Sequence, residues 1–257
     1  MTGTLLEIEE LECRFDGLTA VANLSFDVHA GQIKAVIGPN GAGKSTLFNM
    51  IAGITKPSAG RIRFDGNRLD DLPTFRRARL GIARTFQNLQ IFREMTVLEN
   101  VMVGHHKHGN ASFPQTIIHG PALRTEECVF ATKAMDILDR FGLSAKAQLQ
   151  AGALSFGQMK ILELARALAS EPRLLLLDEP VAGLPHAEAD QMAEIIATLN
   201  TGGMTVLLVE HNMRMVMSLA HEILVLNNGM RIAEGTADEV RRHPEVLAAY
   251  LGEVADA

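Results

Sequence analysis

The stretch GPNGAGKST, residues 38–46, carries three glycines and ends in a lysine and two hydroxyl residues. It matches the pattern G-x-x-x-x-G-K-S, in which glycines let consecutive backbone N–H groups converge on phosphate oxygens without side chains in the way. The preceding IKAVIG is typical of a buried strand and the following LFNMIAGI of a helix, whose N-terminus adds a favourable dipole. Because a phosphate loop requires this strand and helix around it, we predict a phosphate site and not a chance glycine turn.

Each part of this stretch has an expected role. Lys44 is predicted to reach the β and γ phosphates of a nucleotide, and the Ser45 hydroxyl to ligate Mg²⁺. The residues expected to bind the nucleotide here are Gly38, Pro39, Asn40, Gly41, Ala42, Gly43, Lys44, Ser45 and Thr46.

A second candidate site is LLLLDEP, residues 174–180, an apolar strand that ends in two acids. Asp178 is placed where it can hold Mg²⁺ through a water, and Glu179 is suited to polarise or orient an attacking water. A lone Asp-Glu pair would be taken as two exposed strand-end residues. Its coexistence with the glycine loop favours a catalytic pair.

The third stretch is LSFGQ, residues 154–158, at the head of a helix predicted to run to Ser170. Ser155 with Gln158 three residues later is also a capping box, which would need neither Gly157 nor a nucleotide. On the residues alone, both interpretations remain open.

Periodicity elsewhere predicts the fold class. LSFDVH (24–29) alternates like a half-exposed antiparallel strand, while LLLLD (174–178), TVLLVE (205–210) and EILVL (222–226) are apolar strands, the last followed by an NNG turn into MRIAEG. Met192, Ile195, Ile196 and Leu199 recur at helical spacing between them. Strands that alternate with helices predict an α/β fold with a mostly parallel core sheet and an antiparallel β edge.

The middle of the chain differs from this pattern. Residues 88–170 show no clear strand and several helical runs, which predicts a helical subdomain inserted in an α/β core of residues 1–87 and 171–257. The segment GHHKHGNASFPQTIIHG contains several histidines, but its Gly, Asn and Pro content favours a loop between helices over a metal site.

Composition narrows the function classes. With 47% hydrophobic and 21% charged residues the chain is typical of a packed globular protein, and its net charge of -6 gives no reason to expect a nucleic-acid partner. Seven arginines interleaved with Asp65, Asp70 and Asp71 predict a solvated surface of mixed charge; they are Arg61, Arg63, Arg68, Arg76, Arg77, Arg79 and Arg84.

Location is also constrained by the sequence. Cys13 and Cys128 match neither a metal spacing nor a disulfide framework, which favours a reducing, cytoplasmic compartment. The acidic start MTGTLLEIEE does not resemble a signal peptide, and the longest aliphatic run is LLLL at 174–177. We therefore expect a chain that does not cross a membrane by itself.

The glycine loop, LSFGQ, LLLLDEP and VEH occur in the order and approximate spacing of the ATP-binding subunits of ATP-binding cassette (ABC) transporters, a resemblance that covers essentially the whole chain. It implies a single ABC ATPase domain with the P-loop NTPase fold. LSFGQ would be the cassette signature, with Ser155, Gly157 and Gln158 serving the γ phosphate bound by the opposite subunit.

The same resemblance assigns three further residues. It implies that Gln87 senses Mg²⁺ and the membrane subunit, that His211 is the switch histidine at the γ phosphate, and that Phe15 stacks on adenine. Without it, Phe15 would be taken as a core residue and Gln87 as a surface residue.

Two positions depart from the family pattern. Phe156 replaces the glycine usual in LSGGQ, which alters the surface beside the nucleotide but leaves Ser155 and Gly157 in place. Pro185 stands where cassettes usually carry an Asp that links the two ATP sites of a dimer, which puts the coupling between sites in question.

The segments TFQNLQIFREMTVLENVMVG, VEHNMRMVMSLAHEILVLNNGMRIAEGT and EVLAAYLGE resemble the ATPases of branched-chain amino acid importers, which are similar to those of urea and amide importers. The resemblance implies ATP hydrolysis with ATP and Mg²⁺, at the cytoplasmic face of the inner (plasma) membrane. The implied partners are polytopic permease subunits, a second ATPase that is identical or related, and indirectly a periplasmic or extracellular solute-binding protein, without nucleic acid. Two alternatives remain: another ABC class, such as a lipid or lipopolysaccharide exporter, and a non-transport ABC remodelling protein.

Overall fold

The structure is a computed structural model that describes residues 3–105 and 121–255. Its chain divides into two compact units, Met1–Arg84 with Leu174–Ala257, and Thr85–Arg173. The helical subdomain proposed from sequence, 88–170, falls inside the second unit. Within the described residues, no helix is both long and apolar enough to span a bilayer.

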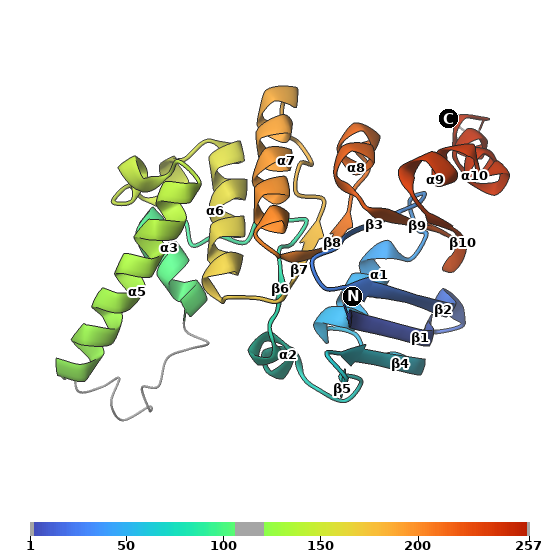
Figure 1. The fold of residues 1–257 in the computed structure, drawn as a ribbon, viewed down its shortest axis with the longest axis horizontal. Coiled ribbons are helices and arrows are strands. Elements are labelled where there is room, and N and C mark those ends of the chain that lie inside the picture. The colour runs from blue at the N-terminus through green and yellow to red at the C-terminus, as the bar shows by residue number, and fades with distance from the viewer. Residues whose placement is uncertain (1–2, 106–120, 256–257) are drawn as a thin grey trace. The chain divides into compact units, whose positions relative to one another are not determined.

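The first unit contains a six-stranded sheet in the order β10-β9-β3-β8-β7-β6 (Figure 1). Every pairing in it is parallel except that of β9 with β10. The strands are β3 (Ile33–Ile37), β6 (Ile82–Arg84), β7 (Leu174–Asp178), β8 (Thr205–Val209), β9 (Glu222–Asn227) and β10 (Met230–Gly235). The mostly parallel α/β core is confirmed, while the short strand β6 escaped the sequence analysis because three residues show no periodicity.

A second, four-stranded sheet carries most of the antiparallel pairing, in the order β2-β1-β4-β5. It consists of β1 (Thr4–Phe15), β2 (Leu18–His29), β4 (Ala59–Phe64) and β5 (Asn67–Arg68). The alternation predicted for β2 is confirmed, since Leu24, Phe26 and Val28 are buried while Asp27 and His29 are exposed.

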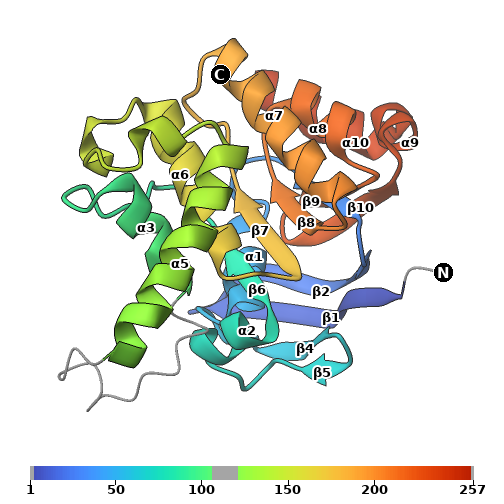
Figure 2. The same cartoon turned by 60° about the vertical axis from the view of Figure 1, so that its left-hand side comes forward.

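Helices fill both faces of the six-stranded sheet. α1 (Lys44–Ala52) lies between the two sheets, and α7 and α8 cover the opposite face, as Figures 1 and 2 show. Of these, α7 spans His186–Thr201 and α8 spans Met213–Leu219. The other described helices of this unit are α2 (Thr74–Leu80), α9 (Ala237–Arg242) and α10 (Pro244–Ala255). The core that joins α1 to both sheets includes Leu47, Phe48 and Ile51, all 0% exposed.

The second unit is helical in the part that the structure describes. α3 (Val97–Gly104), α5 (Pro121–Arg140) and α6 (Phe156–Ala169) lie side by side, with short 3-10 turns at Ser144–Lys146 and Ala151–Ala153 (Figures 1 and 2). Extended pairing among its described residues is limited to one bridge between Thr96 and Gln150. Most of the histidine-containing segment predicted as a loop, residues 106–120, lies outside the described residues.

Two of the seven arginines assigned to a solvated surface are not part of one, and that prediction was wrong for them: Arg77 is buried and Arg84 is largely covered. Arg77 is 2% exposed and donates to the carbonyl oxygens of Met50, Ile51 and Leu72. Burial lowers the pKa of its guanidinium, opposed by the charge of Asp70. The side chain of Arg84 is 9% exposed and pairs with Asp178. A charge-rich sequence does not reveal these sites, because their partners are distant carbonyls and a distant acid.

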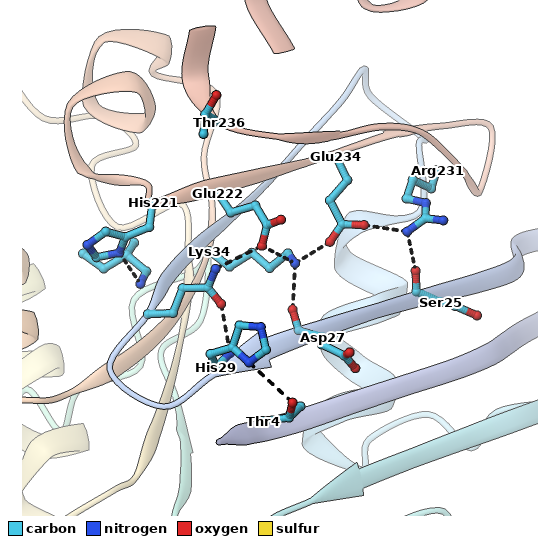
Figure 3. Close-up of polar contacts among 12 residues, drawn as sticks. Thr4, Ser25, Asp27, His29, Lys34, His221, Glu222, Arg231, Glu234 and Thr236 are labelled. Atoms are coloured by element: carbon cyan, nitrogen blue, oxygen red, sulfur yellow. Dashed lines mark hydrogen bonds and ion pairs between the residues drawn. The ribbon is translucent and has the colours of Figure 1, made fainter. Parts of the chain in front are cut away.

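A buried lysine connects four strands of the first unit (Figure 3). Lys34 on β3 is 1% exposed, and its Nζ donates to Glu222 Oε2 at 2.9 Å, to Glu234 Oε1 and to the carbonyl oxygen of Asp27 at 2.7 Å. Glu234 also accepts from Arg231 at 2.5 Å. Two cations thus offset two carboxylates where β2, β3, β9 and β10 meet.

Candidate active site

In the first unit, most of the residues predicted to bind nucleotide or to take part in catalysis lie at the carboxyl ends of three neighbouring parallel strands. β3 leads into the loop at Gly38, β8 into Glu210 and His211, and β7 ends at Asp178 and Glu179. In open parallel sheets, ligands bind outside these carboxyl ends. The strand order therefore brings together residues that are far apart in the sequence.

At two positions of the glycine loop the backbone conformation favours glycine and there is no space for a side chain. Gly38 has φ +151°, and a Cβ there would lie 2.0 Å from the carbonyl oxygen of Leu226. Gly43 has φ +96°, and a Cβ there would lie 2.4 Å from the carbonyl oxygen of Ala20. The loop is packed this closely against β9 and β2, which leaves its backbone as the surface a ligand would meet.

The end of the loop fits a phosphate. α1 begins at Lys44 without a side-chain cap, and an uncapped helix N-terminus offers N–H groups and a positive dipole end to an anion. Lys44 is 6% exposed, and its Nζ donates to the carbonyl oxygens of Gly38 at 2.6 Å and Pro39 at 2.8 Å. Its ammonium therefore lies within the loop, beside exposed Asn40, Gly41 and Ser45.

The predicted metal residue Asp178 is held by a neighbouring strand. Arg84 Nη2 on β6 donates to Asp178 Oδ2 at 2.8 Å, and Arg84 Nη1 donates to Asn49 Oδ1 at 2.7 Å. A carboxylate and the hydroxyl of Ser45 are oxygen donors of the kind that Mg²⁺ prefers, so these residues fit the ion. The sequence does not indicate the pairing of Arg84 with Asp178, which follows from the pairing of β6 with β7.

Two of the residues predicted to be catalytic, Glu179 and His211, are in contact. His211 Nε2 lies 3.1 Å from Glu179 Oε1, and their side chains are 44% and 18% exposed. Glu179 has φ +48°, an uncommon conformation for a residue with a Cβ, and its N–H donates to the Val209 carbonyl oxygen at 2.9 Å. The sequence predicted a role for each residue but not their contact, which joins the ends of β7 and β8.

Phe15 is the last residue of β1 and is 48% exposed. Interpreting it as a core residue is therefore wrong. An exposed aromatic face can stack on a planar base, which is what the adenine-binding prediction requires.

In the second unit, Gln87 is exposed in the loop that follows β6. The buried carboxylate of Glu163 on α6 holds this loop, since its Oε1 accepts from the N–H groups of Phe86 at 3.4 Å and Gln90 at 3.3 Å. Burial raises the pKa of Glu163, although these hydrogen bonds oppose the shift. The sequence does not indicate this role of Glu163, because a lone acid in a helix gives no sign of a partner more than seventy residues away.

The signature stretch forms the N-terminus of α6. The Ser155 side chain accepts from the Gln158 N–H at 3.3 Å, and Gln158 Oε1 accepts from the Ser155 N–H at 3.2 Å. The capping box is thus present. An exposed serine hydroxyl that accepts one hydrogen bond still has a proton to donate, so the box is compatible with a ligand role. Gly157 is buried, and Phe156 is 45% exposed.

Pro185, the departure after the two acids, is the N-cap of α7. That helix starts without a side-chain cap, because proline has no side-chain acceptor. An aspartate at this position would have supplied both an acceptor and a charge.

Comparison with known proteins agrees with this geometry. The model of the family described as "ABC transporter" matches residues 21–182, and that of "Branched-chain amino acid ATP-binding cassette transporter" matches residues 231–256. The high-affinity branched-chain amino acid transport ATP-binding protein BraF of Pseudomonas aeruginosa is 42% identical over 98% of this chain and 100% of its own length. The corresponding protein LivG of Escherichia coli strain K12 is 40% identical over the same shares.

Solved structures show the same similarity. A nucleotide-free ATP-binding cassette from an ABC transporter superposes with a TM-score of 0.84 and 33% identity, over 96% of this chain and 99% of its own. The ADP conformation of MJ1267, an ATP-binding cassette of an ABC transporter, gives 0.84 and 32%, over 98% and 100%.

Proposed function

The chain belongs to the ABC transporter family and is one of its ATPases, and from this premise we propose that it powers the import of branched-chain amino acids or related small polar solutes. The observation that supports this solute class is the end-to-end similarity to BraF and LivG, at 42% and 40% identity over 98% of the chain.

The proposed chemistry is mainly electrostatic. Lys44 and the backbone N–H groups of the glycine loop offset charge on the transferring phosphoryl group, and Glu179 orients the attacking water. His211, 3.1 Å from Glu179, would hold that carboxylate and contact the γ phosphate. Mg²⁺ would be held by Ser45, Asp178 and Gln87, and when bound it supplies positive charge to the phosphates.

We propose that hydrolysis requires two ATPase chains. Ser155, Gly157 and Gln158 would contact the nucleotide bound by a second ATPase, identical or related, and Phe15 would stack on the adenine of the chain's own ATP. The exposure of Ser155 and Phe15 supports these roles. Polytopic permeases would hold the pair at the cytoplasmic face of the membrane, a solute-binding protein would act through them, and nucleic acid would have no part.

Copurification tests the transport role. The tagged full chain, extracted from membranes in mild detergent, should carry a polytopic membrane protein and a second cassette, and the complex should hydrolyse ATP faster in proteoliposomes that contain a loaded amino-acid-binding protein. Association with a ribosome or DNA that survives 0.3 M salt, with no permease, would refute the proposal.

Glu179→Gln tests the two-chain mechanism. The substitution keeps size and hydrogen bonding but removes the charge that polarises water, so ATP with Mg²⁺ should bind, persist and lengthen the lifetime of the dimer. Sedimentation velocity with ATP, with ADP and without nucleotide measures this, with the related ATPase coexpressed where the chain alone is monomeric. Wild-type turnover would remove Glu179 from the catalytic role, and a lack of ATP-dependent association in both formats would remove the two-chain mechanism.

A further inference from the structure

We propose that Glu210 is a positioning residue that fixes Glu179 and His211 relative to each other. The inference rests on the catalytic roles proposed above for those two residues. Glu210 is the last residue before His211 in VEH and directly follows β8. It is 3% exposed, although most carboxylates lie at the surface.

Both oxygens of this buried carboxylate accept hydrogen bonds, and each faces a different catalytic segment. Oε1 accepts from the N–H of Val181 at 3.0 Å, two residues after Glu179. Oε2 accepts from the N–H groups of His211 at 2.9 Å and Asn212 at 3.0 Å. One side chain therefore joins the loop after β7 to the loop after β8, by three charge-assisted hydrogen bonds.

The loop after β7, which Glu210 holds through Val181, contains a strained backbone conformation at Glu179. Glu179 has φ +48°, and an uncommon backbone conformation persists only where the surroundings determine it. The Glu179 N–H is held by the Val209 carbonyl oxygen at 2.9 Å, and Val181 is held by Glu210 at 3.0 Å. The unusual backbone of Glu179 is thus fixed by one hydrogen bond at its own N–H and a second two residues later, and both acceptors belong to the chain at the end of β8.

On the other side Glu210 orients the histidine. It fixes the backbone of His211 and of Asn212, whose side chain caps α8. The 3.1 Å contact between His211 Nε2 and Glu179 Oε1 then closes a ring through Glu179, Val181, Glu210 and His211. Its two halves, the Glu179–His211 contact and the Glu210 bridge, link the same two loops.

Only a carboxylate of this length satisfies all three donors. Glutamine has the same shape but one acceptor oxygen, so its NH₂ group would face either Val181 or the pair His211 and Asn212, donor against donor. Aspartate keeps the charge but is one methylene shorter. Each substitution should release one of the two loops while leaving the glycine loop intact.

The test compares Glu210→Gln with wild type in the copurified transporter complex. We expect kcat for ATP to fall by about 10- to 100-fold, because small displacements of catalytic groups cost this much. The KM for ATP and the affinity for a nonhydrolysable ATP analogue should stay within about twofold, because Lys44 and its loop are untouched.

Hydrogen exchange of the full chain without nucleotide reports the positioning directly. Peptides that contain Val181 or His211 and Asn212 should exchange faster in Glu210→Gln, at one or both segments, while a peptide from α1 should be unchanged. Glu222→Gln is the matched control: it removes a partly buried carboxylate at the opposite end of β9 from the carboxyl edge and should lower the melting temperature without changing kcat.

The outcomes are distinct. Wild-type kcat, unchanged exchange at both segments, or an equal loss of kcat in Glu222→Gln would overturn the role of Glu210. If Glu210→Gln does not fold, Glu210→Asp is measured in the same way and judged by the same criteria. Glu179→Gln is assayed in parallel: wild-type turnover there would refute the proposed site itself, whereas its loss beside normal Glu210→Gln activity would refute only this inference.

Discussion

Replacing Lys34 by methionine is expected to destabilise the chain by about 2–3 kcal/mol while nucleotide binding is retained. Methionine has a similar length and fills the same space, so the change removes the ammonium and not the packing. Lys34 lies near the amino end of β3, and three strand residues lie between it and Gly38, a span of about 13 Å along the strand. The substitution therefore tests the stability of the fold apart from the nucleotide site.

The magnitude follows from what the lost charge leaves behind. Removing one partner of a fully buried ion pair costs about 3–5 kcal/mol, because the other charge is stranded. Here Glu222 keeps a hydrogen bond from Gln32 at 3.0 Å and Glu234 keeps Arg231 at 2.5 Å, and their side chains are 33% and 18% exposed (Figure 3). Because water and the remaining donors still solvate both carboxylates, the loss in free energy of unfolding should lie at the lower end of that range or just below it.

Thermal unfolding followed by circular dichroism measures the effect. A loss of 2–3 kcal/mol corresponds to a fall of about 4–12 °C in melting temperature for a chain of this size. Lys56→Met is the matched control, since Lys56 pairs with Asp71 at a similar 2.8 Å but both side chains are more than 70% exposed, and no shift is expected. Equal melting temperatures for the two variants would refute the reasoning.

The Lys34–Glu222 pair predicts that the stability of the chain depends on pH. Burial of Glu222 acts to raise its pKa, but the hydrogen bond and charge of Lys34, with Gln32 and His29, outweigh it and hold the pKa below its ordinary 4.5. Stabilisation from a lowered carboxyl pKa is complete above the unfolded value and is lost as the pH falls through the folded value. The gap in melting temperature between wild type and Lys34→Met should therefore be full at pH 7 and narrow below about pH 4.5. A constant gap would contradict the assignment.

Three further outcomes concern the nucleotide site. Lys44→Ala should abolish turnover and weaken ATP binding measured by titration, since it removes a fixed positive charge from the loop; unchanged affinity would mean that the loop is not a phosphate site. Gly43→Ala should abolish ATP binding, because its Cβ would lie 2.4 Å from the carbonyl oxygen of Ala20 in β2. Gly41→Ala shares a positive φ, +79°, but has no atom within 4 Å of its Cβ and should retain more binding; equal affinities would argue against this steric reasoning. Ser155→Arg should leave ATP binding by the isolated chain intact and block hydrolysis in the assembled transporter, and a melted α6 instead would favour a purely capping role.

Local sequence was sufficient wherever a function depends on contiguous backbone. The loop from Gly38 to Ser45 is proposed to bind phosphate through consecutive N–H groups, so its spacing and the flanking strand and helix indicate it, and the structure adds the reason that Gly38 and Gly43 cannot carry a side chain. The capping box of Ser155 and Gln158 spans four residues and was likewise visible in the sequence. Alternation and apolar runs predicted β2, β7, β8 and β9 because burial on one or both faces leaves a periodic trace.

Only the tertiary structure decided which distant side chains meet. Arg84 pairs with Asp178 across 94 residues, and Glu210 reaches Val181 across 29, because β6, β7 and β8 lie next to one another in the sheet. Lys34 and Glu222 are likewise 188 residues apart. In a sequence, an isolated charged residue is indistinguishable from one on a solvated surface. Only the order of the strands shows that a partner lies beside it and that water is excluded. The sequence thus indicated the glycine loop and the strands of the six-stranded sheet other than β6, while the order of those strands determined which charges are buried and that Glu210 joins the loops after β7 and β8.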